Sequence, residues 1–317
     1  MGTKEFLLQE LPLVSVVVVT YNSANTIIET LESIKEQSYP NIELIISDDA
    51  STDDTIEKCR KWMAANGRKF LNSKIISSER NKGIPANCNK GIQASSGKFL
   101  KPIAGDDALM VSCLMDNVQH ILIRPEIDIQ LSQMEIYDTN FKNNCSLGIW
   151  RSDALTDFFP DEISAGSQYR MLLQNDQVGN TPSVFLRRSI FDRIGFYDEE
   201  FPWIEDYPFW LKATKAGIKI YFLDPVTVKY RQHSSSIHNN GNVQFMLPSF
   251  FKNEKIRQKY IYPNVGFWQR LHKKHGYNMA LIFKFFTGNR YYPSVSKIYN
   301  LLSFQSNFYS QIFRPRH

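Results

Sequence analysis

The sequence predicts an α/β fold: a doubly wound, mostly parallel sheet with helices on both faces, followed by a mainly helical C-terminal extension. Residues 13–20 read LVSVVVVT, a nearly unbroken β-branched run, which is typical of a central strand buried on both faces. Apolar residues at three-and-four spacing follow, as in an amphipathic helix. The alternation of strand and helix then repeats up to the acidic pair at 106–107, which is the pattern of a parallel sheet with crossover helices.

The predicted elements follow one another with short connections. In the first part of the chain we expect strands at 13–20, 42–47, 74–77 and from 97 towards 106, and helices at 27–35, 54–65 and 86–94. The first helix closes before Pro40, because proline stops helices. Beyond residue 107 the pattern is mixed. It predicts one or two strands at 127–137, a helix at 167–173, a strand entering a helix at 182–190, a helix at 207–216, and two strands at 219–223 and 226–231.

Four polar clusters lie where predicted strands end, at residues 20–23, 48–53, 80–83 and 106–107. In doubly wound sheets ligands bind beyond the carboxyl ends of the strands, so we expect a ligand site at this edge. The adjacent carboxylates Asp106 and Asp107 follow a buried strand, and oxygen ligands of this kind suit Mg²⁺ or Mn²⁺. A pair of solvated turn aspartates is the alternative, because Gly-Asp-Asp is also a common turn composition.

The composition is that of a globular protein with a sizeable core. The four cysteines of the 317-residue chain form no Cys-x-x-Cys pair, which argues against a zinc site or a disulfide framework and fits a reducing cytosol. The N-terminus lacks the basic and apolar regions of a signal peptide. No apolar run approaches the roughly 20 residues that span a bilayer. We therefore expect a cytoplasmic protein.

The charge is distributed unevenly between two predicted domains, at 1–240 and 241–317. The second contains twelve Lys and Arg residues and one acid, Glu254, so that its net charge is +11. The whole chain carries +5, and residues 1–240 therefore carry −6. Such asymmetry predicts an anionic surface as a partner of the extension. Nucleic acid is not an expected partner, and the sequence leaves the oligomeric state open.

Six short motifs, in order, resemble those of family 2 glycosyltransferases with the GT-A fold. They are VSVVVVTYNS at 14–23, ELIISDDASTDDT at 43–55, NKGIPANCNKGIQASSG at 81–97, AGDD at 104–107, WIEDYPFWLKATKAG at 203–217 and YRQH at 230–233. The resemblance covers roughly residues 13–238. It implies inverting transfer of a sugar from a nucleotide sugar, such as a UDP-sugar, to a hydroxyl group of a glycan.

The resemblance also implies which residues bind the donor. Those implied for the nucleotide or the donor sugar are Thr20, Tyr21, Asn22, Asp48, Asp49, Arg80, Asn81, Lys82 and Asp106. Asp49 would accept a hydrogen bond from the base, and Asp48 would orient the turn. Turn formation or helix capping is the alternative for these two aspartates, and a solvated loop is the alternative for residues 80–82.

Metal and catalytic roles follow from the same resemblance. Asp107 would bind Mn²⁺ or Mg²⁺ and His233 would complete its ligands, so that the cation stabilises the departing diphosphate. Asp206 would be the general base, with a pKa raised by burial, and Glu205 is the alternative base. Asp206 could also cap the helix that follows it. Trp203 would stack on the acceptor sugar or pack in the core.

Aromatic residues interleave with Lys and Arg throughout the extension. This mix is typical of helices at a membrane surface, so we expect peripheral binding to the inner face of the cell membrane and a lipid-linked acceptor in bacterial surface polysaccharide synthesis. A helical subdomain or an oligomer contact is the alternative for this segment. For the whole chain the alternatives are a nucleotidyltransferase that makes a sugar nucleotide, and a non-catalytic nucleotide-binding module.

Overall fold

The structure is a computed structural model. It describes residues 11–142, 145–150, 157–174, 178, 181–232 and 248–290, together with 292, 294–295, 298–299 and 302. The chain divides into two compact units, Met1–Gln232 and His233–His317. The predicted boundary at residue 240 lies outside the described residues and stays a prediction.

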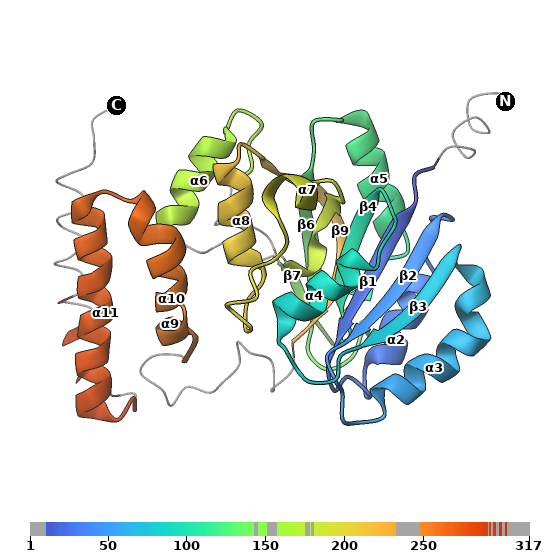
Figure 1. Ribbon diagram of the computed structural model, residues 1–317, viewed down its shortest axis with the longest axis horizontal. Helices are drawn as coiled ribbons and strands as arrows, with labels where there is room; N and C mark the ends of the chain where they lie inside the picture. Colours follow the sequence, from blue (N-terminus) through green and yellow to red (C-terminus); the bar gives the residue numbers. More distant parts are fainter. Residues whose placement is uncertain are drawn as a thin grey trace. The chain divides into compact units, whose positions relative to one another are not determined.

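The first half of the sheet is parallel and lies in the first unit. Its strands are β1 (Val14–Thr20), β2 (Ile42–Asp48), β3 (Asn72–Ser77) and β4 (Phe99–Ala104), in the order β3-β2-β1-β4 (Figure 1). Every residue of β2 is buried, and so are six of the seven in β1. Strands covered on both faces need apolar side chains on both faces, which is why the β-branched runs identified them in the sequence.

The second half of the sheet mixes both directions. Beyond β4 the order continues with β8 (Phe185–Arg187), β6 (Ile129–Tyr137), β9 (Ile220–Arg231) and β5 (Ala108–Leu109), and β7 (Ser146–Trp150) pairs with β6. β6 and β9 are parallel, whereas β8 is antiparallel to both of its neighbours and β5 is antiparallel to β9. The predicted α/β fold class is confirmed, with a sheet that is parallel in its first half and mixed in its second.

The prediction of two strands at 219–223 and 226–231 was wrong, because β9 is one continuous strand. The register explains the difference: Leu223 pairs with Ser132 and Val226 pairs with Gln133. Asp224 and Pro225 thus form a bulge between two consecutive pairs. Proline cannot donate to a strand ladder, and a bulge accommodates it without ending the strand.

Helices cover both faces of the sheet. The first unit contains α2 (Ile27–Lys35), α3 (Thr55–Asn66), α4 (Ile84–Gln93), α5 (Cys113–Ile123), α6 (Ala165–Gln174), α7 (Ile190–Ile194) and α8 (Asp206–Lys215), with short 3₁₀ turns η1 (Gly67–Lys69) and η4 (Thr181–Ser183). The helices α2, α3 and α5 pack in one apolar core with Val14, Val16 and Val18. Side chains alternate along a strand, so Val17 faces the other side and lies against Gly91 of α4.

The second unit is helical in its described residues, as predicted. It contains α9 (Pro248–Lys252), α10 (Glu254–Ile256), the π-helical turn η5 (Arg257–Ile261), the 3₁₀ turn η6 (Tyr262–Asn264) and α11 (Phe267–Thr287). Glu254 is buried and holds these short elements together: it accepts a hydrogen bond from the Tyr262 hydroxyl at 2.8 Å and pairs with Arg257 at 3.3 Å. Among the described helices of the chain, none is long and apolar enough to cross a bilayer.

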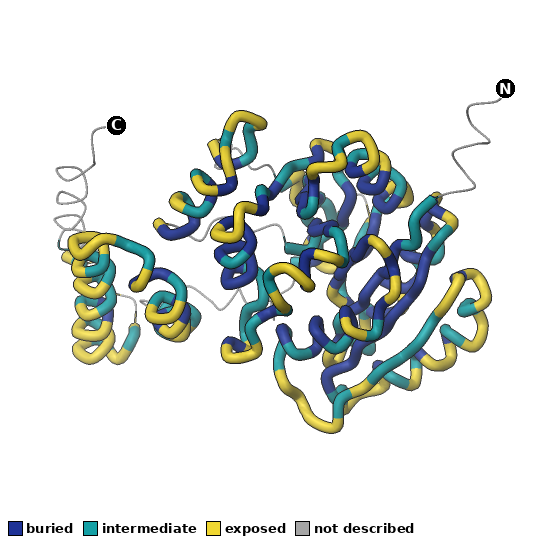
Figure 2. The backbone as a smooth tube through the Cα atoms, turned by 45° about the horizontal axis from the view of Figure 1, so that its top comes forward, coloured by how far each residue is buried: buried dark blue, intermediate teal, exposed yellow. Residues whose placement is uncertain are grey.

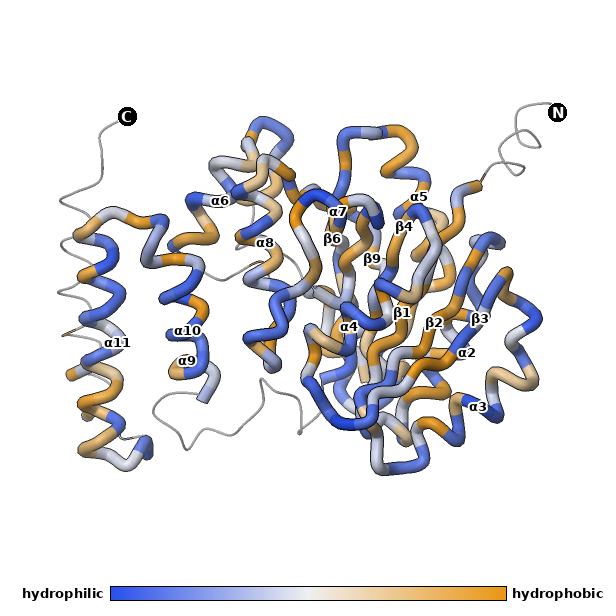
Figure 3. The backbone as a smooth tube through the Cα atoms, in the orientation of Figure 1, coloured by the Kyte–Doolittle hydropathy of each residue, from blue (hydrophilic) through white to orange (hydrophobic). Residues whose placement is uncertain are grey.

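Much of α11 is exposed, and apolar residues recur along it between polar ones (Figures 2 and 3). Its exposed large apolar side chains are Phe267, Trp268, Leu271, Leu281, Ile282, Phe285 and Phe286. At 3.6 residues per turn they fall within an arc of about 140°, which they share with Lys274, His275 and Asn278. The helix also carries four Lys or Arg residues and no acid. We name this set of seven side chains the α11 face.

Candidate active site

The parallel strands bring the predicted polar clusters to one edge of the sheet. Thr20 pairs with Asp48 at the ends of β1 and β2, and Val19 pairs with Ala104 of β4. Residues 20–22, 48–49 and 106–107 therefore meet at the carboxyl end of the sheet, as the fold class predicts.

Asp48 and Asp49 organise the loops at this edge. The buried Asp48 carboxylate accepts hydrogen bonds from the backbone N–H of Ser51 at 2.9 Å and from the Ser77 hydroxyl at 3.1 Å. The buried Asp49 carboxylate accepts from the backbone N–H groups of Lys82 and Gly83, at 2.8–3.1 Å. Asp48 thus holds its own turn, and Asp49 holds the predicted donor loop at 80–83 against it.

The remaining donor-side residues line these loops. Asn22 accepts a hydrogen bond from the backbone N–H of Thr52 at 2.8 Å and has a left-handed backbone, with φ of 52°. Tyr21 is 47% exposed, and the side chains of Arg80, Asn81 and Lys82 are exposed as well. They can reach a ligand in solvent, and their roles stay predictions.

Gly83 joins the donor loop to the loop that leads into the predicted base. Its φ is +92°, and a Cβ atom placed on it would lie 2.4 Å from the carbonyl oxygen of Pro202. The same carbonyl accepts a hydrogen bond from the N–H of Ile84 at 3.0 Å. Only glycine allows both this backbone angle and this close approach. Residues 203–206 therefore follow directly after a contact with the donor loop.

Two asparagines of α4 were missed by the sequence reasoning. Asn87 donates to the carbonyl oxygens of Thr20 and Ser47, at 3.2 and 3.0 Å. Asn89 donates to the carbonyl oxygen of Tyr197 at 2.9 Å and accepts from the Tyr197 N–H at 3.0 Å. Residues two apart lie about 200° apart around a helix, so the Asn-Cys-Asn sequence places one amide towards the sheet and the other towards the 197–206 loop.

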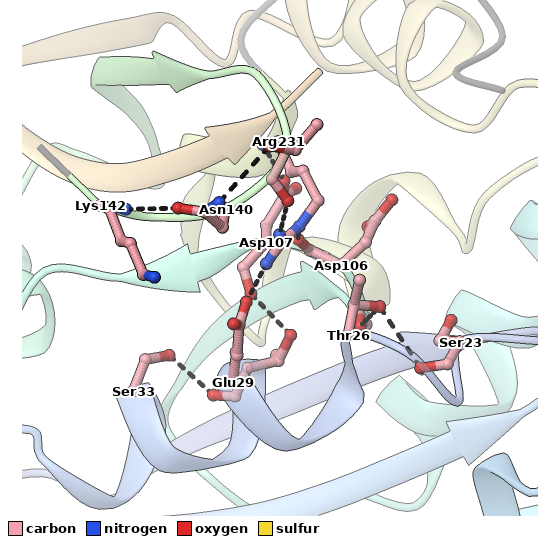
Figure 4. Close-up of polar contacts among 12 residues, drawn as sticks. Ser23, Thr26, Glu29, Ser33, Asp106, Asp107, Asn140, Lys142 and Arg231 are labelled. Atoms are coloured by element: carbon pink, nitrogen blue, oxygen red, sulfur yellow. Dashed lines mark hydrogen bonds and ion pairs between the residues drawn. The ribbon is translucent and has the colours of Figure 1, made fainter. Parts of the chain in front are cut away.

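Arg231 anchors the acidic motif at the end of β4 (Figure 4). Its backbone N–H donates to the Asp107 carboxylate at 2.9 Å, and its Nε donates to the Asp106 carbonyl oxygen at 2.8 Å. Its guanidinium also pairs with Glu29 of α2 and donates to the Thr139 carbonyl oxygen. The sequence placed Arg231 in the YRQH motif without a role, and it offered no signal for Glu29.

The acidic motif fits a divalent cation. Burial, together with the neighbouring Asp106 carboxylate, raises the pKa of Asp107 well above its ordinary value, although Arg231 and Lys101 oppose this effect. A second buried oxygen points to a ligand here: the Thr20 hydroxyl has no hydrogen-bond partner, and it would lie 2.9 Å from a Cβ atom on Gly105. A cation beside these oxygens would offset the cost of burying them.

Few side chains in the described residues could bind such a cation. No group of three His, Cys, Asp or Glu side chains that could hold a metal gathers within that part of the chain. His233, the predicted second ligand, lies outside it. One or two carboxylates, with the phosphates of a substrate, are a usual set for Mg²⁺, so the donor chemistry agrees with the predicted metal.

The two carboxylates predicted as candidate general bases, Glu205 and Asp206, lie at the start of α8. One carboxylate oxygen of Asp206 accepts from the N–H of Tyr207 at 2.6 Å, and the other accepts from the hydroxyl of Thr181. Burial, together with the Asp206 carboxylate, raises the pKa of the adjacent Glu205 to about 8. Glu205 therefore holds a proton at neutral pH, and the raised pKa that the sequence predicts for Asp206 stays a prediction.

Trp203 is partly buried, and its ring lies edge-to-face with Phe201 at 5.9 Å. Its predicted contact with an acceptor sugar stays a prediction. Cys88 of α4 lies close enough to Asp49, Glu205 and Asp206 for all three carboxylates to raise its pKa, in addition to the larger effect of burial. Donor-side and base-side acids therefore surround the same turn of α4.

The model of the glycosyl transferase family 2 matches residues 15–195. The chain belongs to glycosyl transferase family 2. It is 30% identical over 258 residues to the Escherichia coli UDP-Glc:alpha-D-GlcNAc-diphosphoundecaprenol beta-1,3-glucosyltransferase WfaP, with 80% of this chain and 87% of WfaP covered. A second E. coli enzyme named for the same activity, WfgD, is 27% identical over 229 residues, with 72% of this chain and 80% of WfgD covered. The protein is thus a glycosyltransferase.

Solved structures support the fold. S. aureus TarS 1-349, crystallised in complex with UDP-GlcNAc, aligns with a TM-score of 0.57 at 18% identity, and the match covers 96% of this chain and 93% of TarS 1-349. This likeness concerns the fold alone. Together with the family match it confirms the GT-A architecture that the sequence predicts.

The raised pKa of Glu205 predicts how stability depends on pH. A carboxyl group with a folded pKa of about 8 and an ordinary unfolded pKa stabilises the fold fully below about pH 4.5, and that contribution is lost as the pH rises through 8. Glu205→Gln cannot ionise. Between pH 5 and pH 9 the wild type should therefore lose about 2–4 kcal/mol of unfolding free energy that the variant keeps. Urea unfolding at both pH values measures this difference. The exposed Glu162→Gln is the control, and parallel pH curves for Glu205→Gln and wild type would contradict a neutral buried Glu205.

Proposed function

We propose that this glycosyltransferase transfers a sugar from a UDP-sugar to a hydroxyl group of a lipid-linked glycan, with inversion at the anomeric carbon and Asp206 as the general base. One observation carries the proposal. The Gly83–Pro202 contact joins the loop held by Asp49 to the loop that presents Asp206, so that donor-side and base-side groups share one site.

The relatives support the class of substrates. The names of WfaP and WfgD give both enzymes a UDP-glucose donor and an acceptor in which GlcNAc is linked to diphosphoundecaprenol. An acceptor of that class fits the synthesis of a bacterial surface polysaccharide. Membership of the family supports transfer of a sugar over synthesis of a sugar nucleotide.

The donor would lie across the carboxyl ends of β1, β2 and β4. Asp49 keeps lone pairs for the ring N–H of a uracil while it holds the 82–83 amides. The unpaired hydroxyl of Thr20 is available to a ligand beside Gly105. Asp107 and His233 would hold Mn²⁺ or Mg²⁺, and Asp106 would face the ribose or the donor sugar. When bound, such a cation would supply Lewis-acid stabilisation of the diphosphate leaving group.

Asp206 would take the proton of the acceptor hydroxyl as that oxygen attacks the anomeric carbon. A base must be ionised to accept a proton. Two adjacent carboxyl groups do not ionise equally, because each charge opposes the other. The proton on Glu205, whose pKa is raised to about 8, favours Asp206 over Glu205 as the base. Attack on the face opposite the diphosphate inverts the configuration.

The extension would place the enzyme at its acceptor. Apolar side chains of the α11 face suit the boundary between headgroups and acyl chains, and Lys and Arg near an anionic surface contribute on the order of 1 kcal/mol each. The described part of the second unit offers seven such apolar groups on a helix without an acid. This supports peripheral binding to the inner face of the cell membrane.

The base assignment is tested with Asp206→Asn, which keeps the shape of the side chain and an oxygen that accepts a hydrogen bond. It should lower kcat by about 10²–10⁴, measured as release of UDP from UDP-sugars, with the KM for the donor nearly unchanged. Glu205→Gln is the matched control and should retain more activity. If Glu205→Gln is the more damaging of the two, the base is Glu205.

The metal assignment is tested with Asp107→Ala and with a chelator. Asp107→Ala should abolish turnover, and EDTA should inactivate the wild type until Mn²⁺ or Mg²⁺ is restored, because the diphosphate would leave without a counter-charge. Titration with Mn²⁺, followed by electron paramagnetic resonance, should show loss of binding in the variant. Full activity in EDTA would contradict this assignment.

The membrane proposal is tested by co-sedimentation with anionic vesicles at low and high salt. The full chain should sediment at low salt and be released at high salt, because ions screen the attraction. Phe285→Ser combined with Phe286→Ser removes two side chains that are 83% and 79% exposed, and it should weaken sedimentation. Ile123→Ser, at a position 79% exposed on α5, is the matched control. Unchanged sedimentation of the double variant would show that the α11 face is not the contact.

A further inference from the structure

The carboxylate of Asp206 is held by a residue outside every motif that the sequence analysis identified. Its Oδ2 accepts a hydrogen bond from the hydroxyl of Thr181, 25 positions earlier in the chain, and its Oδ1 accepts from the N–H of Tyr207. With one donor on each oxygen, the plane of the carboxylate is set by two separate elements, η4 and α8.

η4 is anchored deep in the sheet. Lys101 of β4 is fully buried, and its ammonium group donates to the carbonyl oxygens of Pro182 and Val184, the second at 3.2 Å. The Ser183 hydroxyl accepts from the backbone N–H of Ser132 in β6 at 3.0 Å. Two central strands therefore hold the turn that presents Thr181. A lysine is buried only where its donors are satisfied, so the turn and the lysine depend on each other.

Acidic side chains surround Asp206. The titratable groups that face it are Glu205 beside it, Cys88 of α4 and Tyr197, and each has a pKa raised by burial and by Asp206. None of them brings a positive charge. A hydroxyl that donates to a carboxylate favours its ionised form, and within the described part of the chain Thr181 supplies this bond to Oδ2.

We propose that Thr181 is a positioning residue for the general base: it orients the Asp206 carboxylate towards the acceptor hydroxyl and keeps it ionised. The inference rests on the proposed function, since it assigns Thr181 a role only if Asp206 is the base. Lys101 acts one step further away, through the turn. The proposal requires the hydroxyl of Thr181, whereas a residue that acted through packing alone would need only the shape of the side chain.

The test compares Thr181→Val, which keeps the shape and removes the hydroxyl, with Thr181→Ser, which keeps the hydroxyl. Both are made in the wild type and in Asp206→Asn, and kcat, both KM values and the pH profile of kcat/KM are measured. Thr181→Val should lower kcat about tenfold, since hydrogen bonds to charged groups are worth that much or more. The acid limb of its profile should move up by about one pH unit. Thr181→Ser should stay within about twofold of the wild type.

The double variant separates positioning from general structure. In Asp206→Asn the base is absent, so Thr181→Val should cause no further loss of the residual rate. An equal loss in both backgrounds, an unmoved acid limb, or a Thr181→Ser variant as poor as Thr181→Val would overturn the inference. If Asp206→Asn itself leaves kcat unchanged, it is the proposed base that fails, and the two failures are thereby distinguished.

Discussion

The site depends on how the buried helix α4 satisfies the polar backbone around it. The carbonyl oxygen of Thr20 lies at the end of β1, where it accepts from the N–H of Asp49 at 3.0 Å, and that of Ser47 lies next to the end of β2. Asn87 donates to both, and Asn89 clamps the backbone of Tyr197 on the opposite side. One helix thus fixes the distance between the strand ends and the loop that carries Glu205 and Asp206. Gly91 lets it lie close to the sheet, because a Cβ there would come within 2.4 Å of Val17.

Two buried charges of opposite sign lie in and just beyond β4. Lys101 lies within the strand and Asp107 lies three residues beyond its end, and each perturbs the pKa of the other. Burial lowers the pKa of Lys101 to about 8, while Asp107 is disfavoured as an anion. Arg231 meets the motif mainly through its backbone N–H and a carbonyl contact, and it directs its charge to Glu29. This arrangement offsets the charge of Asp107 only partly, which agrees with the cation site that we propose.

The second unit shows a different balance. Glu254 is its one acid and is used internally, by Tyr262 and Arg257. The exposed apolar residues of α11 lie on one side of the helix, so burying them in lipid would require no rearrangement of the helix itself. The same helix is not apolar enough to cross a bilayer, and its pattern agrees with the contact at a membrane surface that we propose.

The sequence by itself determined the parallel half of the sheet, its helices and the positions of the acidic motifs. β-branched runs, three-and-four spacing and polar strand ends are local signals, and parallel strands place their ends together without further information. Asp49 and Asp107 follow predicted strand ends, whereas the pair Glu205–Asp206 was predicted from the resemblance to the family.

Only the tertiary structure decided which groups hold those residues in place. Asn87, Asn89, Lys101, Thr181 and Arg231 act through contacts with residues distant in the chain, such as the 81 positions between Lys101 and Pro182, and no local pattern records such a pairing. The bulge at Asp224–Pro225 likewise follows from the register against β6. The protonation of Glu205 was beyond the sequence for the same reason: a pKa depends on burial and on neighbouring charges, and both are properties of the folded chain.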